Sequence, residues 1–475
     1  MFQGNDLEKN MKAGFFETDI TPPLGTDRPA TASKLKVQDY SDPVKVRACV
    51  LEDEDGKKAA LIGIDTTDTG EGFRRKIDDL FPGMEIIVSA SHTHYGGVLR
   101  DKFPGIDTAS EEIRKIVVDC SVSYDEAYYD YSLRQVVSAV KEAEKRLQEA
   151  DFSFGTGKVE HLIFNRRIQM KNGDCMTHPG KGNPDNVGYA GPVDEATGVV
   201  GVWKKGTEEL LGFLFNFSCH ACINLTGVTS DYPGLAIETV RKVYGEGVGA
   251  VFLSGASGDV TQIDDMSLRK DTGKPAATRL GRTIGGEIVK ILASADRGPI
   301  RTLKGTRESI PVTPRIPDPE FLPMAYEMVK HYDPKNNTHH IAKYYVIEDL
   351  LAKAFPERKI VLQTLQIGPL VIGSSPGEIF TRYGLDYKKG SQFPYTWFSS
   401  LSSGLLGYVP TPDCFELANG GYEAETAFYA ADTGTNIVKS LLKQLEDFVP
   451  DEVPQGERVA PSKSVWGYNF NKKKN

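Results

Sequence analysis

Two kinds of hydrophobic pattern alternate along the chain. Short apolar runs that end at glycine, serine or aspartate predict buried strands, and longer segments with an apolar residue at every third or fourth position predict amphipathic helices. The predicted strands cover residues 46–52, 58–65, 85–90, 151–156, 199–204, 210–218, 250–253, 359–367 and 370–374. The predicted helices cover residues 73–80, 124–150, 235–244, 276–295 and 433–448.

Some of the predicted strands are joined by tight turns and others by helices. The turn "DEDG" separates 46–52 from 58–65, and "GPL" marks the turn between 359–367 and 370–374, so each pair predicts a hairpin. Helices separate other strands, which indicates crossover connections. Hairpins mixed with crossovers predict an α/β (mixed α+β) fold, built as a mixed-sheet sandwich with flanking helices.

The organisation and charge of the chain limit its class. No proline- or serine-rich linker divides the sequence before residue 449, so we expect one domain at residues 12–448 and a C-terminal tail at 449–475. The formal net charge is −9. Because nucleic-acid binding requires a basic surface, we expect no nucleic-acid partner. The sequence does not indicate an oligomeric state.

Membrane and export signals are not visible in the sequence. No run of eighteen apolar residues is present, so no transmembrane segment is predicted. The first twenty residues lack the apolar centre of a signal peptide. We therefore expect a cytoplasmic protein, with a secreted protein whose signal peptide has been removed as the alternative.

Ionisable side chains repeatedly follow the apolar strands. His92 and His94 follow "EIIVSA", His220 follows "FLFNFSC", Asp259 follows "FLSGASG", and Glu378 follows "VIGSSPG". Strand ends that open into glycine-rich loops are common places for chemistry, because glycines let a ligand approach the backbone. These five residues are therefore candidates for a functional site.

The histidines also have structural interpretations. His92 and His94 would point to the same side of an extended strand, but they could instead cap the strand end together with the hydroxyls of Ser91 and Thr93. His220 could be a hydrogen-bonded histidine of the core. Two histidines and a carboxylate are nevertheless the ligand set of many zinc hydrolases, so the candidates together predict a mononuclear zinc site. The spacing leaves open which two histidines bind the metal.

Neighbouring motifs have simpler interpretations. Glu378 alone would fit a helix N-terminus, where the macrodipole favours a carboxylate. Cys219 and Cys222 form a C-x-x-C, and since a second such pair is absent we interpret them as two small buried thiols. The loop "SGASGDV" lacks both the Gly-Lys-Ser/Thr ending and the G-x-G-x-x-G spacing, so nucleotide binding is not expected.

An ordered set of short motifs resembles the catalytic domain of the neutral/alkaline (non-lysosomal) ceramidases. The motifs occur in the family's order over about residues 12–445. They are "GFFETDITPP", "SASHTHYGG", "FNRR", "NFSCHACINLTGVTSDYPG", "FLSGASGDVT", "SSPGEIF", "GYVPT" and "GGYEAET". The resemblance implies the fold of that catalytic domain and the hydrolysis of N-acyl sphingosine to sphingosine and a fatty acid.

The resemblance also implies a set of ligands. Zinc would be bound by His92, His220, Glu378 and Tyr408, the tyrosine of "GYVPT". Without the resemblance, this tyrosine would be interpreted as an aromatic side chain that packs beside the following proline. His94 would support the ligands or act as an acid or base.

Three further residues would act on the substrate, again by resemblance. Arg166 of "FNRR" and Tyr422 of "GGYE" would bind the amide and stabilise the oxyanion that develops when zinc-activated water attacks it. Thr261 stands where the ceramidases have serine, because their Gly-Asp-Val-Ser-Pro-Asn is replaced by "GDVTQI". Threonine keeps the hydroxyl and adds a methyl group, and the Pro-Asn pair is lost.

Departures from the family pattern bear on the substrate more than on the zinc chemistry. The changed loop lies at the substrate, the tail at 449–475 is too short for the immunoglobulin-like domain of the ceramidases, and no export signal is visible. The first hypothesis is a zinc-dependent amidohydrolase of linear lipid amides. The alternative is a family member that hydrolyses a small polar amide, ester or sugar derivative. A third is a non-catalytic binding protein on the same fold.

Overall fold

The computed structural model describes most of the chain. The described residues are 11–29, 35–102, 106–119, 124–223, 226–333, 335–402, 404, 406–417, 419–456 and 458–461. Cys120 and, in the predicted tail, residue 457 and residues 462–475 lie outside them. In the described part of the tail, Asp451 accepts hydrogen bonds from the N–H and hydroxyl of Thr302 at 3.0 and 2.6 Å, which fastens this part to the body. None of the helices in these ranges has the length and apolarity needed to cross a bilayer.

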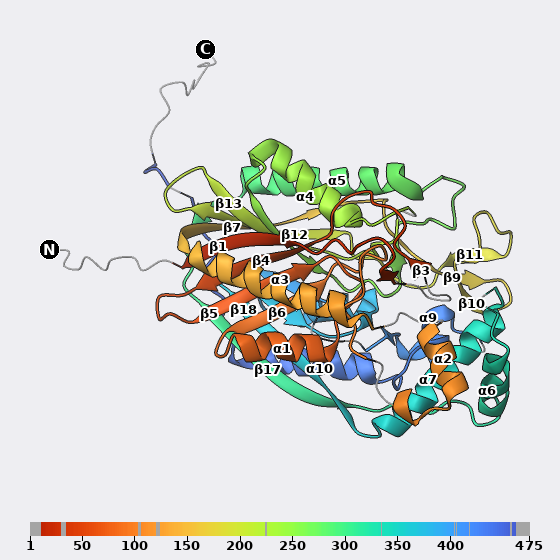
Figure 1. Cartoon of the computed structure of the whole chain (residues 1–475). Coiled ribbons are helices and arrows are strands. Elements are labelled where there is room, and N and C mark those ends of the chain that lie inside the picture. The colour runs from red at the N-terminus through yellow and green to blue at the C-terminus, as the bar shows by residue number, and fades with distance from the viewer. Residues whose placement is uncertain are drawn as a thin grey trace, which may run out of the picture.

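Within the described residues, nine strands form the largest sheet, in the order β14-β13-β12-β7-β1-β4-β5-β6 with β16 beside β7 (Figure 1). Their bounds are Lys12–Asp19 (β1), Lys45–Glu52 (β4), Lys58–Ile64 (β5), Glu85–Ala90 (β6), Gln148–Lys158 (β7), Ala196–Lys204 (β12), Leu210–Phe217 (β13), Gly249–Ser254 (β14) and Arg297–Gly298 (β16). Strands β4 and β5 form the predicted hairpin, whereas β5 and β6, and β13 and β14, are parallel pairs.

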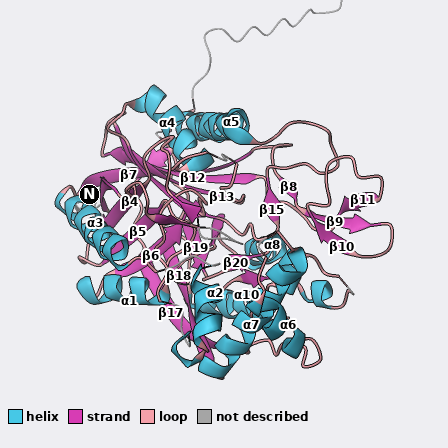
Figure 2. Cartoon of the chain, turned by 45° about the vertical axis from the view of Figure 1, so that its right-hand side comes forward, coloured by secondary structure: helices cyan, strands magenta, loops and turns pink. Residues whose placement is uncertain are grey.

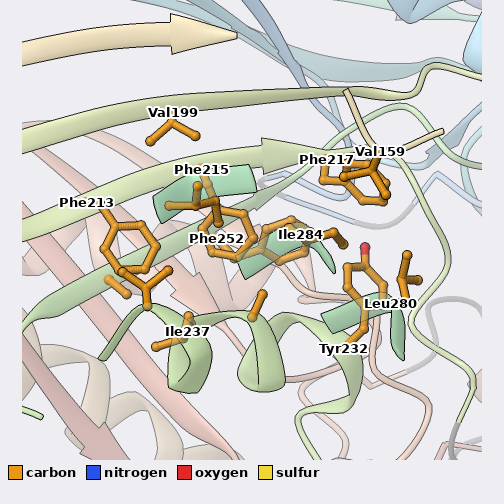
Figure 3. Packing of buried hydrophobic residues seen from close by; sticks show 14 of the residues in the cluster. Val159, Val199, Phe213, Phe215, Phe217, Tyr232, Ile237, Phe252, Leu280 and Ile284 are labelled. Carbon is orange, nitrogen blue, oxygen red and sulfur yellow. The ribbon is translucent and has the colours of Figure 1, made fainter. Parts of the chain in front are cut away.

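Alternate residues of these strands face two different cores, because successive side chains of a strand point to opposite sides. Helices cover the outer face: Glu71–Leu80 (α1), Glu126–Lys145 (α3), Asp231–Tyr244 (α4) and Gly273–Ser294 (α5). In β4, Val50 packs in the core beneath α1 and α3, whereas Leu51 faces the inner core. In β13 and β14, Phe215 and Phe252 pack against α4 and α5, with ring centroids 4.8 Å apart (Figure 3).

A second sheet covers the inner face. It has the order β17-β18-β19-β21, with bounds Leu303–Val312 (β17), Arg358–Ile367 (β18), Leu370–Ser374 (β19) and Tyr395–Ser399 (β21). Leu365 and Ile372 of this sheet share one core with Leu61 and Leu253 of the large sheet. Helices cover its other face: Thr381–Gly390 (α8) and Thr433–Gln444 (α10). The layers are therefore helix, sheet, sheet and helix, which confirms the predicted mixed-sheet sandwich with flanking helices.

A group of helices with its own apolar core lies at one end of the sandwich (Figure 2). Its members are Glu111–Asp119 (α2), Leu322–Lys330 (α6) and Asn337–Ala354 (α7). Short elements lie around the same end, namely Phe164–Asn165 (β8), Arg167–Met170 (β9), Cys175–Thr177 (β10), Asn186–Tyr189 (β11), Val260–Thr261 (β15), Glu378–Ile379 (β20), Tyr408–Val409 (β22) and Tyr422–Glu425 (α9). They supply several of the predicted site residues.

Most predicted elements are confirmed, with shifted ends. The helix predicted at 124–150 ends at Lys145, because β7 begins at Gln148, and the helix predicted at 235–244 begins at Asp231. Strands β1 and β17 and helix α7 have no counterpart among the predicted elements. Their sequences carry many polar residues, as in "LKGTRESIPV" of β17, so the apolar pattern on which the predictions depend is weak there.

The carboxyl ends of strands from both sheets meet at one edge. The backbone N–H of Ser254 donates to Ser89 Oγ at 3.1 Å, and the N–H of Ser400 donates to the Ser254 carbonyl at 2.8 Å. These bonds join the ends of β6, β14 and β21. The loops that follow β6, β13 and β19 begin at this edge, so residues more than a hundred positions apart are brought together.

Candidate metal centre

Two histidines are oriented by backbone carbonyls. His92 has a backbone φ of 63°, which turns the chain sharply out of β6, and its Nδ1 lies 2.7 Å from the carbonyl oxygen of Thr67. His220, which follows β13, has its Nδ1 2.7 Å from the carbonyl oxygen of Ser257. Because a carbonyl only accepts, each Nδ1 carries a hydrogen, and in the neutral imidazole each Nε2 then has a lone pair.

The two Nε2 atoms converge on the carboxylate of Glu378. Its Oε2 lies 3.3 Å from His92 Nε2 and 3.2 Å from His220 Nε2. Burial acts to lower the pKa of His92, but Glu378 outweighs burial and raises it, so without a cation a proton on His92 Nε2 faces the carboxylate. Two imidazole nitrogens and a carboxylate oxygen are typical zinc ligands, and carbonyls behind the imidazoles are typical of zinc sites. The residues present therefore fit a zinc ion.

His94 belongs to the same cluster. Its Nε2 lies 3.4 Å from His92 Nε2, and the ligating atoms of His92, His94 and His220 all lie within 4.8 Å of one another. Its N–H donates to the Ala221 carbonyl at 3.2 Å, which ties the loop after β6 to the loop after β13. Both predicted strand-end loops thus meet in one cluster.

Tyr408 stands beside Glu378. The two residues are paired in register between the parallel strands β20 and β22, and the N–H of Glu378 donates to the Gly407 carbonyl at 2.8 Å. The hydroxyl of Tyr408 accepts a hydrogen bond from Arg166 Nη2 at 3.0 Å. Burial raises the pKa of Tyr408 well above its ordinary value, and Arg166 acts in the opposite direction.

Arg166 is buried and fixed by several acceptors. Its Nε donates to Glu423 Oε1 at 2.6 Å and its Nη2 donates to the Gly258 carbonyl at 2.9 Å. The other carboxylate oxygen of Glu423 accepts from Thr177 Oγ1 at 2.5 Å. A buried ion pair whose members are all hydrogen-bonded holds its geometry firmly. The guanidinium is therefore held against Tyr408.

Tyr422 lies in an aromatic group beside this cluster. Its ring centroid lies 5.7 Å from that of Tyr408 and 5.9 Å from that of His340, which is nearly parallel to it at 11°. Its hydroxyl oxygen lies 3.2 Å from that of Tyr344. Burial raises the pKa of Tyr422 well above its ordinary value, so the phenol remains a proton donor.

Two candidates make their hydrogen bonds away from the histidines. The hydroxyl of Thr261 donates to Gln262 Oε1 at 2.9 Å. The carboxylate of Asp259 accepts from the N–H and hydroxyl of Thr381 at 2.8 and 2.9 Å, and from the amide of Asn165 at 2.6 Å. Asp259 thus joins three separate segments of the chain, which is an anchoring contact.

Comparisons with known proteins bear on the fold. A scan against protein-family models and a search of curated protein sequences gave no match. Among solved structures, the neutral ceramidase from Pseudomonas aeruginosa matches with a TM-score of 0.69 at 16% identity, over 96% of this chain and 77% of that chain. A structure described as ceramidase complexed with C2 matches with a TM-score of 0.67 at 16% identity, over 98% of this chain and 79% of that chain.

The chain has the neutral-ceramidase fold. This confirms the fold expected from the ordered motifs, since the match covers nearly the whole chain. This chain and each of the two ceramidases share only 16% of their residues. The site residues are therefore assigned from the geometry of this chain.

The electrostatics of the cluster of His92, His94, His220 and Glu378 favour positive charge at its centre. Burial acts to raise the pKa of Glu378, but His92 and His220 outweigh burial and hold that pKa well below its ordinary value. Burial lowers the pKa of His220 to about 4. Burial, and then the neighbouring His92 and His220, lower the pKa of His94 well below its ordinary value. A carboxylate that stays ionised in a buried cluster of three imidazoles is a setting in which a divalent cation is attracted.

Cys219 and Cys222 of the C-x-x-C pair keep the interpretation given from the sequence, that of two small thiols that pack in the fold. Cys219 is buried and Cys222 is half-buried. Burial raises the pKa of both thiols, that of Cys222 to about 12. Thiols in this state are poor nucleophiles and poor metal ligands.

Sequence reasoning missed several residues of the site. His340 and Tyr344 come from α7, which the apolar pattern does not predict, although their spacing of four residues in "NTHHIAKYY" places both rings on one helix face. Arg100 was missed as well. Its Nε and Nη2 bind the buried Asp68 at 2.8 and 2.6 Å, directly after the Thr67 carbonyl that orients His92.

Proposed function

We propose that this chain is a zinc-dependent hydrolase of linear amides, with an N-acyl sphingosine as the first substrate to test. The observation that carries the proposal is the convergence of His92 Nε2 and His220 Nε2 on the Glu378 carboxylate, at 3.3 and 3.2 Å, with a backbone carbonyl behind each imidazole. The fold shared with two ceramidase structures supports the choice of substrate.

Four residues would bind the metal ion, and a fifth would transfer protons. His92, His220, Glu378 and Tyr408 would hold the ion. When bound, zinc lowers the pKa of water and polarises a carbonyl oxygen. His94, neutral and beside the cluster, is suited to accept a proton from the attacking water and to pass one toward the departing amine.

The remaining groups would act on the amide itself. Arg166, held by Glu423, orients Tyr408 and contributes fixed positive charge on this side of the cluster. Tyr422 would donate its hydroxyl proton to the oxygen on which negative charge develops, a contribution worth about 3–4 kcal/mol for a well-placed donor. Thr261 keeps the hydroxyl of the serine that the ceramidases have at this position, and in the absence of substrate this hydroxyl donates to Gln262 Oε1 at 2.9 Å.

The alternative substrate class is a small polar amide, ester or sugar derivative. It is favoured by the polar groups that α7 brings to the site, namely the Tyr344 hydroxyl and the imidazole of His340, and by Gln262 in the altered loop. These groups would hydrogen-bond a polar substrate better than an acyl chain.

The experiment combines metal analysis with substrate hydrolysis. We expect purified protein to contain zinc, to hydrolyse a fluorescent N-acyl sphingosine, and to lose activity with a chelator and regain it with zinc. His92→Ala should lose both metal and activity, whereas His331→Ala, whose side chain is 81% exposed, should lose neither. Protein that holds zinc and hydrolyses only short polar amides or esters would select the alternative. Protein that binds no divalent metal would overturn the proposal.

A further inference from the structure

Helix α7 brings a second phenol to the candidate site. The hydroxyl oxygens of Tyr344 and Tyr422 lie 3.2 Å apart, and their rings cross at 89° with centroids 6.2 Å apart. In the part of the chain that the structure describes, Tyr344 is the one hydrogen-bond partner of the Tyr422 hydroxyl. The Tyr422 ring lies 5.7 Å from that of Tyr408, the register partner of Glu378, so the pair lies beside the candidate metal centre.

The surroundings of Tyr422 fix its ring but leave its hydroxyl proton free to turn. His340 is stacked against the ring, Tyr408 meets it at 74°, and its backbone N–H donates to Thr177 Oγ1 at 3.1 Å. None of these contacts involves the phenolic oxygen. The proton of a phenol rotates about the C–O bond, so the direction in which Tyr422 donates depends on the hydrogen bond that its oxygen accepts.

We propose that Tyr344 is a positioning residue for Tyr422. The O–H of Tyr344 donates to the oxygen of Tyr422, which directs the Tyr422 proton away from Tyr344 and toward the substrate oxygen. A hydroxyl that accepts a hydrogen bond is also a stronger donor, because the two bonds polarise each other. This inference rests on the proposed function, in which Tyr422 donates to the developing oxyanion.

The helix that carries Tyr344 is itself anchored to the segment that carries Tyr422. The Tyr344 ring stacks on Phe428 at 28°, with centroids 6.1 Å apart. The adjacent Tyr345 hydroxyl lies 3.4 Å from Glu425 Oε2 in α9. Both contacts connect α7 to the chain around α9, so the two hydroxyls are held at a fixed separation.

The first test compares three single variants. Tyr344→Phe should lower kcat about three- to tenfold with little change in KM, because one hydrogen bond is lost and no substrate contact is removed. Tyr422→Phe should lower kcat about 10²- to 10³-fold, and adding Tyr344→Phe to it should cause no further loss. Tyr131→Phe is the control, since it removes a tyrosine hydroxyl that donates to the Asp19 carbonyl at 2.9 Å, away from α7 and α9, and it should leave kcat unchanged.

The second test does not depend on activity. In metal-free protein labelled with ¹³C at the tyrosine ζ carbon, the Tyr422 signal is the one missing from Tyr422→Phe. We expect Tyr344→Phe to shift that signal and Tyr131→Phe to leave it in place. An unmoved Tyr422 signal, or a Tyr344→Phe enzyme with unchanged kcat, would overturn the inference while leaving the proposed function intact. If the protein hydrolyses no amide the proposed function fails, and a shifted signal still supports the hydroxyl pair.

Discussion

The sandwich body and helix α7 are stabilised in different ways. In the body, consecutive residues of β13 such as Leu214 and Phe215 are fully buried on opposite faces of the sheet, each in an apolar core. Helix α7 packs apolar residues too, but it also buries ionisable side chains, with Lys343 and Glu348 each 1% exposed. Burial of apolar area stabilises the body, whereas burial of charge lowers stability unless it is matched. Chemistry and polar burial both concentrate at the end of the molecule where α7 lies.

The largest effect on activity is expected for Glu378→Gln, which tests the polar site. The neutral amide keeps the size of the side chain and removes the anionic ligand, so zinc content should fall and kcat/KM should drop about 10³-fold, several kcal/mol of transition-state stabilisation. The metal-free protein should melt at a lower temperature, because the variant loses the attraction by which His92 and His220 hold the pKa of the Glu378 carboxyl well below its ordinary value. Metal analysis, kinetics and thermal melts check the three outcomes. A variant that retains zinc and full activity would contradict the ligand set.

Phe215→Ala tests the sandwich body, where we expect a loss of stability and little change in zinc content or activity. Phe215 is fully buried between Phe213 and Phe252, so truncation should lower the free energy of unfolding by about 3–5 kcal/mol. Zinc content and kcat measured well below the melting temperature should change little. Urea denaturation with Phe215→Leu as the milder control measures the effect. A large loss of kcat in folded Phe215→Ala protein would show that core and site are not separable.

The same division explains how far the sequence predicts the structure. The hairpin at residues 46–52 and 58–65 is predicted because its residues alternate between two apolar cores, and apolar burial is what a hydrophobic pattern reports. His92, His220 and Glu378 are predicted because they follow such strands. The pattern gives no signal for Tyr408, which needed the resemblance to a family.

Helix α7 and its contacts could not be predicted in this way. Tyr344 reaches the site because the helix docks on the chain around α9, some eighty residues later, and that contact is tertiary. Its buried face includes lysine and glutamate, so the apolar periodicity that marks a helix is interrupted. A hydrophobic pattern therefore does not mark residues that are buried in polar contacts.

Glu348→Gln tests the cost of polar burial in α7. Burial raises the pKa of Glu348 to about 8, and among the described residues its oxygens have no hydrogen-bond partner, with Arg315 Nη1 3.7 Å away. The folded state keeps the proton up to about pH 8, whereas an unfolded glutamate releases it near about pH 4.3, so stability should fall by roughly 4 kcal/mol as the pH rises from about 5 to 8.

Glutamine does not titrate, so the Glu348→Gln variant should lack this decline. It should be more stable than the wild type at pH 8 and similar to it at pH 5, as measured by urea denaturation of the metal-free protein across that range. Glu357→Gln, at an exposed position just beyond α7, is the control and should follow the wild-type profile. Parallel pH profiles for wild type and Glu348→Gln would mean that the carboxyl group is hydrated in solution.

The smallest effect is expected at Asp259, a residue that the sequence suggests for chemistry and the structure uses as an anchor. Asp259→Asn replaces one acceptor oxygen with an amide that cannot accept from both Thr381 and Asn165, so the free energy of unfolding should fall by about 1–3 kcal/mol. Zinc content should not change, and kcat should fall less than tenfold, because the carboxylate bonds to the loop rather than to the histidines. Denaturation, metal analysis and kinetics on the same preparation decide the matter. If kcat falls as far as in Glu378→Gln while stability is unaffected, Asp259 takes part in the reaction and is not only an anchor of the loop.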